Sequence, residues 1–108
     1  MTAQRNIKTA PNRTPEDLAL GYVVGKIRNV AGFSQAEFAP LVPIDRDRLA
    51  RIECGRQPAK LDDLIEIEDA FLRLGCYSEQ GYLLYLVRRA IPLVDELLAT
   101  KARDRRAA

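Results

Sequence analysis

The chain has 108 residues, of which 47% are hydrophobic and 30% are charged, proportions typical of one folded domain with a single core. No apolar run approaches the roughly 18 residues of a membrane-spanning helix, and residues 1–14 lack the apolar segment of a signal peptide, so we expect a cytoplasmic protein with no membrane contact. Two cysteines and no histidine supply neither a disulfide framework nor the usual zinc ligands, and we expect no metal and no cofactor.

The net charge of +2 is unevenly distributed along the chain. Basic residues dominate both ends, whereas 10 basic and 14 acidic residues between positions 15 and 100 give that stretch a net charge of −4. Within it, four arginines cluster at 46–56 and five acids at 62–69. This pattern predicts either a molecule with two oppositely charged faces or two ordinary solvated helix surfaces.

The first predicted helix covers about residues 15–31. Thr14 is a good capping residue, Pro15 is tolerated at a first helical position, and the acids that follow suit the positive end of the helix dipole. Apolar residues then recur every three or four positions until Gly32, which predicts the end of the helix.

Two short helices are predicted next. Ser34 and Glu37 have the spacing of a capping box, and Pro40 should strain or shorten the helix that they begin because it lacks a backbone N–H. Asp45 is a suitable cap for another helix, which ends at Gly55. Its apolar residues face inward, so its arginines should remain outside.

The remaining helices are predicted over 61–74 and about 78–100, the second interrupted by a kink or a junction at Pro92. No strand pattern competes, so the fold class is all-α: a compact domain of four to five helices with a C-terminal helical extension. We divide the chain into a flexible basic arm (1–13), a helix-turn-helix domain (14–75), a C-terminal helix or helices that form a dimer contact (76–100), and a flexible basic tail (101–108).

The segment from Ser34 to Gly55 resembles the helix-turn-helix of the phage-repressor (Xre/Cro, lambda repressor-like) family, without a gap. The resemblance implies that Gln35 donates to a DNA phosphate. It also implies that the base-reading positions are Arg46, Asp47 and Arg51. An arginine fork suits guanine O6 and N7, and an aspartate can accept from cytosine N4. Arg48 and Arg56 are interpreted as further phosphate contacts.

The resemblance also implies a structural ion pair between Arg28 and Glu53. Three positions depart from the family pattern, and the first is Pro40, which lies inside the second helix. Pro43 replaces the usual turn glycine and cannot adopt a positive φ, so the turn should differ locally. Asp47 would repel phosphates unless it contacts a base or pairs with Arg51, four residues later.

The last predicted helix has more apolar surface than one core requires. We expect it to form a homodimer, because proteins of this kind bind two half-sites as two-fold dimers; the alternative is that it only packs on the first helix. The predicted interface residues are Tyr82, Leu83, Tyr85, Leu86, Leu93 and Leu97.

The resulting hypothesis is a sequence-specific DNA-binding transcriptional regulator, a dimeric repressor that binds a double-stranded operator. The alternative is a protein-interaction module on the same scaffold, antitoxin-like or adaptor, whose C-terminal helix binds a protein partner. We do not expect an enzyme, because the sequence has no paired catalytic carboxylates, no nucleophile with a base and no glycine-rich phosphate loop.

Overall fold

A computed structural model describes residues 13–107 of the chain, with side chains described as far as 104. Across this range every regular element is helical and there is no strand, so the all-α prediction is confirmed. The predicted N-terminal arm lies outside the described residues, except for Arg13. In chain order the elements are α1 (Pro15–Val30), α2 (Gln35–Phe38), the 3₁₀ helix η2 (Ala39–Leu41), α3 (Arg46–Glu53), α4 (Leu61–Arg73) and α5 (Tyr82–Ala107).

The helices begin at the predicted caps. The Thr14 hydroxyl accepts a hydrogen bond from the Asp17 N–H (3.0 Å), and the Asp45 carboxylate accepts one from the Arg48 N–H (2.8 Å). Each cap satisfies a backbone donor that the first turn of a helix leaves without a partner. Helices α1 and α3 therefore each begin directly after the capping residue that the sequence predicted.

Pro40 determines how the second helix ends. After four residues α2 tightens into η2, whose backbone N–H of Val42 bonds the carbonyl of Ala39 (3.1 Å). The N–H of Ile44 bonds the same carbonyl (3.1 Å), which closes the turn that contains Pro43. The turn before α3 is therefore built around one shared acceptor, and no glycine takes part in it.

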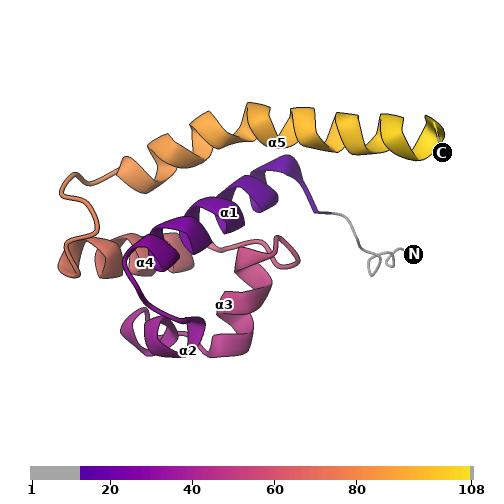
Figure 1. Cartoon of the computed structure of the whole chain (residues 1–108). Coiled ribbons are helices and arrows are strands. Elements are labelled where there is room, and N and C mark those ends of the chain that lie inside the picture. Colours follow the sequence, from indigo (N-terminus) through magenta and orange to yellow (C-terminus); the bar gives the residue numbers. More distant parts are fainter. Residues whose placement is uncertain (1–12, 108) are drawn as a thin grey trace.

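The core lies where α1 crosses the other helices. Figure 1 shows α1 between α5 on one side and the α2–α3 unit on the other, and it contacts both α3 and α5. The largest fully buried side chains are Phe38, Phe71, Leu49, Ile52, Ile67, Leu83, Val24 and Val42. Each helix longer than one turn thus has a buried apolar face, as the helical spacing predicted.

Helix α5 continues through Pro92 as one helix, so Pro92 does not mark a junction between two helices. The helix also extends to Ala107, so residues 101–107 do not form the expected flexible tail. Pro92 is exposed, so the Arg88 carbonyl that it leaves unbonded lies near solvent and can be hydrated. The tail residues are mostly alanine, arginine and lysine, which favour helix, and basic residues suit a helix C-terminus.

Among the described residues, no helix is both long enough and apolar enough to span a bilayer.

Candidate nucleic-acid interface

Helix α3 has one buried face and one exposed face. Leu49 and Ile52 are fully buried, whereas Arg46, Asp47 and Arg51 are exposed. A helix that is anchored on one side and charged on the other has the shape that the DNA major groove admits. The structure therefore puts all three predicted base-reading residues on the solvent side of α3.

The charged side chains of α3 differ in how they are held. The side-chain Nε of Arg51 donates to the side-chain oxygen of Gln57 (2.7 Å), not to Asp47. The ion pairs among the described residues are Arg28–Glu53, Arg48–Asp63 and Arg73–Asp69, so the alternative pairing of Asp47 with Arg51 is not formed. Both charges remain available on the exposed face.

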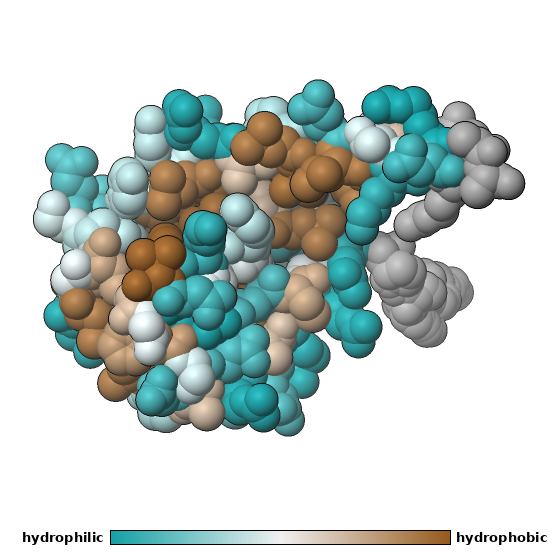
Figure 2. All heavy atoms as spheres, viewed as in Figure 1, coloured by the Kyte–Doolittle hydropathy of each residue, from teal (hydrophilic) through white to brown (hydrophobic). Residues whose placement is uncertain are grey.

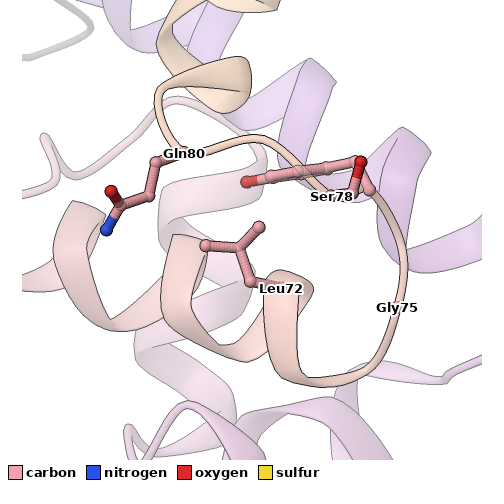
Figure 3. A pocket seen from close by; sticks show the side chains of 5 residues that line it. Leu72, Gly75, Ser78 and Gln80 are labelled. Atoms are coloured by element: carbon pink, nitrogen blue, oxygen red, sulfur yellow. The ribbon is translucent and has the colours of Figure 1, made fainter.

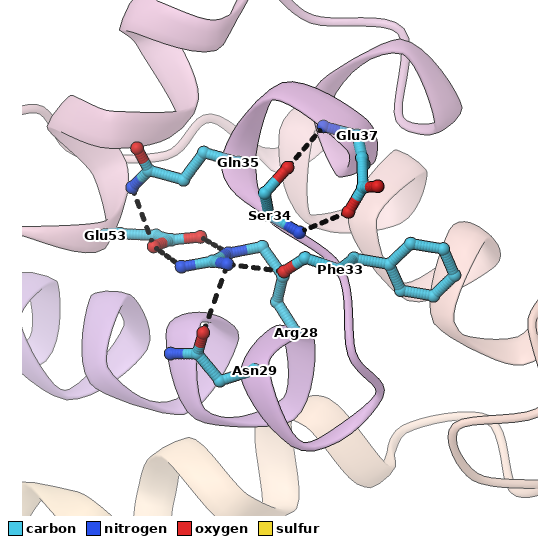
Figure 4. Close-up of polar contacts among 7 residues, drawn as sticks. All are labelled: Arg28, Asn29, Phe33, Ser34, Gln35, Glu37 and Glu53. Carbon is cyan, nitrogen blue, oxygen red and sulfur yellow. Dashed lines mark hydrogen bonds and ion pairs between the residues drawn. The ribbon is translucent and has the colours of Figure 1, made fainter.

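The predicted ion pair between Arg28 of α1 and Glu53 of α3 is present and has two hydrogen bonds. Arg28 Nε lies 2.7 Å from Glu53 Oε2 and Nη2 lies 2.9 Å from Oε1, with both side chains 9% exposed (Figure 4). Arg28 Nη1 also donates to the carbonyl oxygen of Phe33 (2.6 Å). The pair joins α1, the loop before α2 and the end of α3, and the hydrogen bond with Glu53 raises the pKa of Arg28 against the opposing effect of burial.

Gln35 belongs to the same network. Its side-chain Nε2 donates to Glu53 Oε1 (3.0 Å), which ties the first residue of α2 to the last residue of α3 (Figure 4). The side-chain amide has two N–H groups, so this contact leaves one donor for another partner. Gln35 is thus oriented by Glu53, and its predicted phosphate contact stays a prediction.

Arg48 does not lie where the sequence interpretation expected it. Its guanidinium pairs with Asp63 Oδ2 at the start of α4, and only about a fifth of the Arg48 side chain is exposed. Burial disfavours the charged form of Asp63, but hydrogen bonds from Arg48 and from the Lys60 N–H outweigh it and lower the pKa of this carboxyl. Arg48 therefore fastens α3 to α4, and its charge is already neutralised by a buried partner.

The charge on the exposed face is mixed. Arg46, Arg51 and Arg56 are exposed, as are the acids Asp45 and Asp47. Glu53 pairs with Arg28, and Asp63 pairs with Arg48. Neither of these buried carboxylates therefore forms an ion pair with an exposed arginine of this surface. Of the three predicted phosphate contacts, Arg56 is the one whose side chain is both exposed and outside the ion pairs of the described residues.

Two glycines of α1 position this surface, and the sequence interpretation missed them. A Cβ at Gly21 would lie 2.7 Å from the carbonyl carbon of Glu53, and closer still to the carbonyl oxygens of Ile52 and Glu53. A Cβ at Gly25 would lie 3.2 Å from Glu53 Oε1. Their four-residue spacing on one helix face was the available sequence evidence. Because neither glycine has a Cβ, the backbone of α1 can approach the last turn of α3.

The four leucines among the predicted dimer residues divide into two groups. Leu83 is 1% exposed and packs inside the core of its own chain, so its assignment to the interface is wrong, and Leu86 is half-buried beside that core. Leu93 and Leu97 are 64% and 62% exposed, and both line a groove of about 390 Å³ between α1 and α5. Figure 2 shows hydrophobic residues gathered along this side of the molecule. The groove is completed by Leu18, Tyr22, Ala90, Val94, Leu98 and Lys101.

The two tyrosines lie at the end of a row of aromatic rings that the sequence interpretation also missed. Tyr82 stacks on Tyr85 with ring centroids 5.8 Å apart, and the Arg89 guanidinium carbon lies 5.6 Å from the centroid of Tyr85. Successive ring contacts of 5.0–6.3 Å run through Phe33, Phe38, Phe71, Tyr77, Tyr82 and Tyr85. The row runs from the start of α2 through Phe71 of α4 and Tyr77 to the start of α5, so these rings connect α5 to the α2–α3 unit through intervening residues.

A surface hollow lies between the end of α4 and the start of α5, lined by Leu72, Gly75, Tyr77, Ser78 and Gln80 (Figure 3). The Tyr77 hydroxyl donates to Glu68 Oε2 (3.3 Å), and burial together with this carboxylate raises the pKa of Tyr77. The polar side chains left in the lining are uncharged.

In the described part of the chain, no group of three or more histidine, cysteine, aspartate or glutamate side chains is placed to hold a metal ion.

Comparison of the chain with protein-family models, with curated proteins and with solved structures finds no match. The functional interpretation therefore depends on the geometry of α2, α3 and α5.

Proposed function

We propose that the chain is a sequence-specific DNA-binding transcriptional regulator, a dimeric cytoplasmic repressor that reads the major groove with α3. The observation that carries the proposal is the two-sided character of α3. Its inner face is fixed by buried Leu49 and Ile52, and its outer face presents Arg46, Asp47 and Arg51 to solvent. The proposal assigns the chain no catalytic activity.

The chemistry of the outer face supports base recognition. Each arginine fork can donate two parallel hydrogen bonds to O6 and N7 of a guanine, and the Asp47 carboxylate can accept from N4 of a cytosine. Arg56, in the loop after α3, supplies a charge for the phosphate backbone, and Gln35 retains an N–H for a second phosphate. We therefore expect G·C pairs within each half-site.

The ion pairs behind α3 support a preformed reading surface. Arg28 and Glu53 fix the end of α3 on α1, and Arg48 and Asp63 fix its first turn on α4. A recognition helix that is already held by its neighbours loses little conformational freedom when it enters DNA, so more of the contact energy contributes to affinity.

We propose a second copy of the chain as the occupant of the α1–α5 groove. One helix-turn-helix buries too little surface for tight specific binding, and two copies would span half-sites one helical turn apart. Tyr82, Leu86, Leu93 and Leu97 recur at helical spacing along one flank of α5. Because α1 separates α5 from α3, pairing through this flank leaves the arginines of α3 uncovered (Figure 1).

The salt dependence of binding tests the proposal. We expect affinity for duplex DNA to fall steeply with salt, and Arg56→Gln to reduce the slope of log affinity against log salt by about 1. Arg88→Gln is the matched control, since Arg88 is exposed on α5. Helix α5 lies on the far side of α1 from α3 (Figure 1). Equal slopes for the wild type and Arg56→Gln would contradict the phosphate assignment.

The exposed apolar groove favours a second candidate function, a protein-interaction module of the antitoxin or adaptor kind. In that case the groove would bind a different protein, and α3 would have no DNA partner. No salt-dependent binding to any duplex, together with tight capture of a protein partner that Leu93→Glu abolishes, would favour this candidate over the first.

A further inference from the structure

We propose that Gln57 is a specificity-determining residue that positions Arg51 for base recognition. The inference rests on the proposed function, because it concerns how an arginine of α3 is aimed at DNA. Gln57 lies outside α3, in the loop before α4, and the sequence interpretation assigned it no role. Its side-chain oxygen accepts a hydrogen bond from Arg51 Nε at 2.7 Å.

The contact between the two residues is made at two points. Besides the side-chain bond, the backbone N–H of Gln57 donates to the Arg51 carbonyl (3.3 Å), beside the N–H of Arg56 (2.9 Å). Gly55 makes this return possible, because its φ of +78° reverses the chain after α3. Pro58 then restricts Gln57 to extended backbone conformations. The loop after α3 thus brings the Gln57 side chain back beside the Arg51 side chain.

The hydrogen bond from Arg51 Nε leaves the two terminal nitrogens of the guanidinium available for DNA. A guanidinium has five N–H donors in a fixed plane, and Gln57 occupies the one on Nε. Four donors on the two terminal nitrogens remain, which is enough for two parallel bonds to guanine O6 and N7. Because Nε is in the same plane as those nitrogens, holding it limits the directions in which they can point.

Because Gln57 is uncharged, its hydrogen bond with Arg51 does not neutralise Arg51, and Arg51 forms no ion pair with Asp47. These two residues are four apart on α3, a spacing at which an arginine and an aspartate commonly pair. Arg51 bonds a neutral amide instead, so it keeps its full positive charge and Asp47 keeps its carboxylate free. An acid and a base can then contact different bases from neighbouring turns of one helix.

Holding Arg51 also changes the cost of recognition. An exposed arginine normally loses several rotamers when it binds, whereas one that is already held loses fewer. Arg46 is exposed and has no comparable side-chain contact among the described residues. We therefore expect the base pair read by Arg51 to be more strictly selected than the one read by Arg46.

The experiment is selection of bound sites from a random duplex library by the full chain, with wild type, Arg51→Ala, Gln57→Ala and Gln57→Glu in parallel. Arg51→Ala identifies the base pair that Arg51 reads. We expect Gln57→Ala to reduce preference at that same base pair by up to about tenfold, the effect of losing one hydrogen bond, and to leave the rest of the motif intact. Gln80→Ala, an exposed glutamine far from α3 in the chain, is the matched control.

Two further variants distinguish positioning from a general effect. Gln57→Glu keeps an oxygen for Arg51 Nε, so the base preference should survive while the added charge weakens binding to all sequences. In the double variant Arg51→Ala with Gln57→Ala, preference at that base pair should be no lower than in Arg51→Ala alone.

The outcomes separate this inference from the proposed function. A wild-type motif that Gln57→Ala leaves unchanged, or weakens uniformly at all positions, would overturn the inference while the function stands. No motif for the wild type would overturn the function and, with it, the role of Gln57 in recognition. The NMR signal of the Arg51 Nε–H group tests the contact without DNA, since it should be protected from exchange in the wild type and not in Gln57→Ala.

Discussion

Replacing Gly21 by alanine tests the close contact between α1 and α3, because two effects predict opposite signs. Intrinsic helix propensity favours alanine over glycine in a helix interior by about 1 kcal/mol, so the change should stabilise α1. In the structure, the added Cβ would lie 2.7 Å from the Glu53 carbonyl carbon and nearer to the carbonyl oxygens of Ile52 and Glu53. Backbone atoms cannot rotate away as a side chain can, so α1 and α3 would have to separate.

The size of the stability loss can be estimated from the contacts that a separation of α1 and α3 would disturb. Forcing extra atoms into a packed interior costs about 1–3 kcal/mol, and here the displaced elements also carry the Arg28–Glu53 pair. The contacts are with backbone atoms, so we take the upper end of this range; subtracting the propensity gain then leaves a net loss of about 2 kcal/mol in the free energy of unfolding. Gly25→Ala is the matched control, because its Cβ meets only side-chain atoms of Glu53, the nearest at 3.2 Å, and its stability should stay within about 1 kcal/mol of wild type.

Urea denaturation followed by circular dichroism measures both variants. A lower midpoint at unchanged slope reports a change in stability rather than in the denatured state. If Gly21→Ala were as stable as the wild type or more stable, helix propensity alone would account for this position, and the close approach of α1 to α3 would be refuted.

Three further predictions concern other contacts of the same structure. Glu53→Ala should lower the free energy of unfolding by about 3 kcal/mol, because it leaves a buried guanidinium without its carboxylate; replacing Arg28 and Glu53 together by methionine should restore most of it, and a loss below about 1 kcal/mol would refute the reasoning. The folded pKa of Asp63 is lowered, so the stability it contributes is present above the usual aspartate pKa and is lost as the pH falls through the folded value. The stability gap between wild type and Asp63→Asn, measured by urea denaturation, should therefore close on acidification below about pH 4, and a gap independent of pH would contradict the ion pair. Leu97→Glu should convert a dimer to a monomer in sedimentation equilibrium, whereas Leu84→Glu, at an exposed position on another face of α5, should not; a dimer that survives Leu97→Glu would exclude the groove as the interface.

Local features of the fold were predictable because they depend on neighbours in the chain. The Ser34–Glu37 capping box and the Asp45 cap are contacts over three residues, and both form as predicted. Pro40 shortened the second helix for the same reason, since the missing N–H affects only its own turn. The Arg28–Glu53 pair spans 25 residues and came from the family resemblance, not from local physics.

Contacts between distant segments were not predictable in this way. Arg48 was interpreted as a phosphate contact from its place in the helix-turn-helix, and only the fold shows that Asp63 of α4 lies beside it. Gly21 was missed, because its role depends on where the last turn of α3 lies in the fold. Helical spacing located the apolar flanks of α5, but it could not tell that Leu83 covers the core while Leu93 and Leu97 remain exposed.

The central claim is that α3 reads DNA sequence, and selection of bound sites at about 150 mM salt, with wild type beside Arg46→Ala, tests it most directly. We expect a two-fold symmetric motif with half-sites about one helical turn apart, and degraded preference at one base pair of each half-site in Arg46→Ala. A wild-type protein that enriches no motif, or a motif that Arg46→Ala leaves intact, would contradict the assignment of α3 as the reading helix.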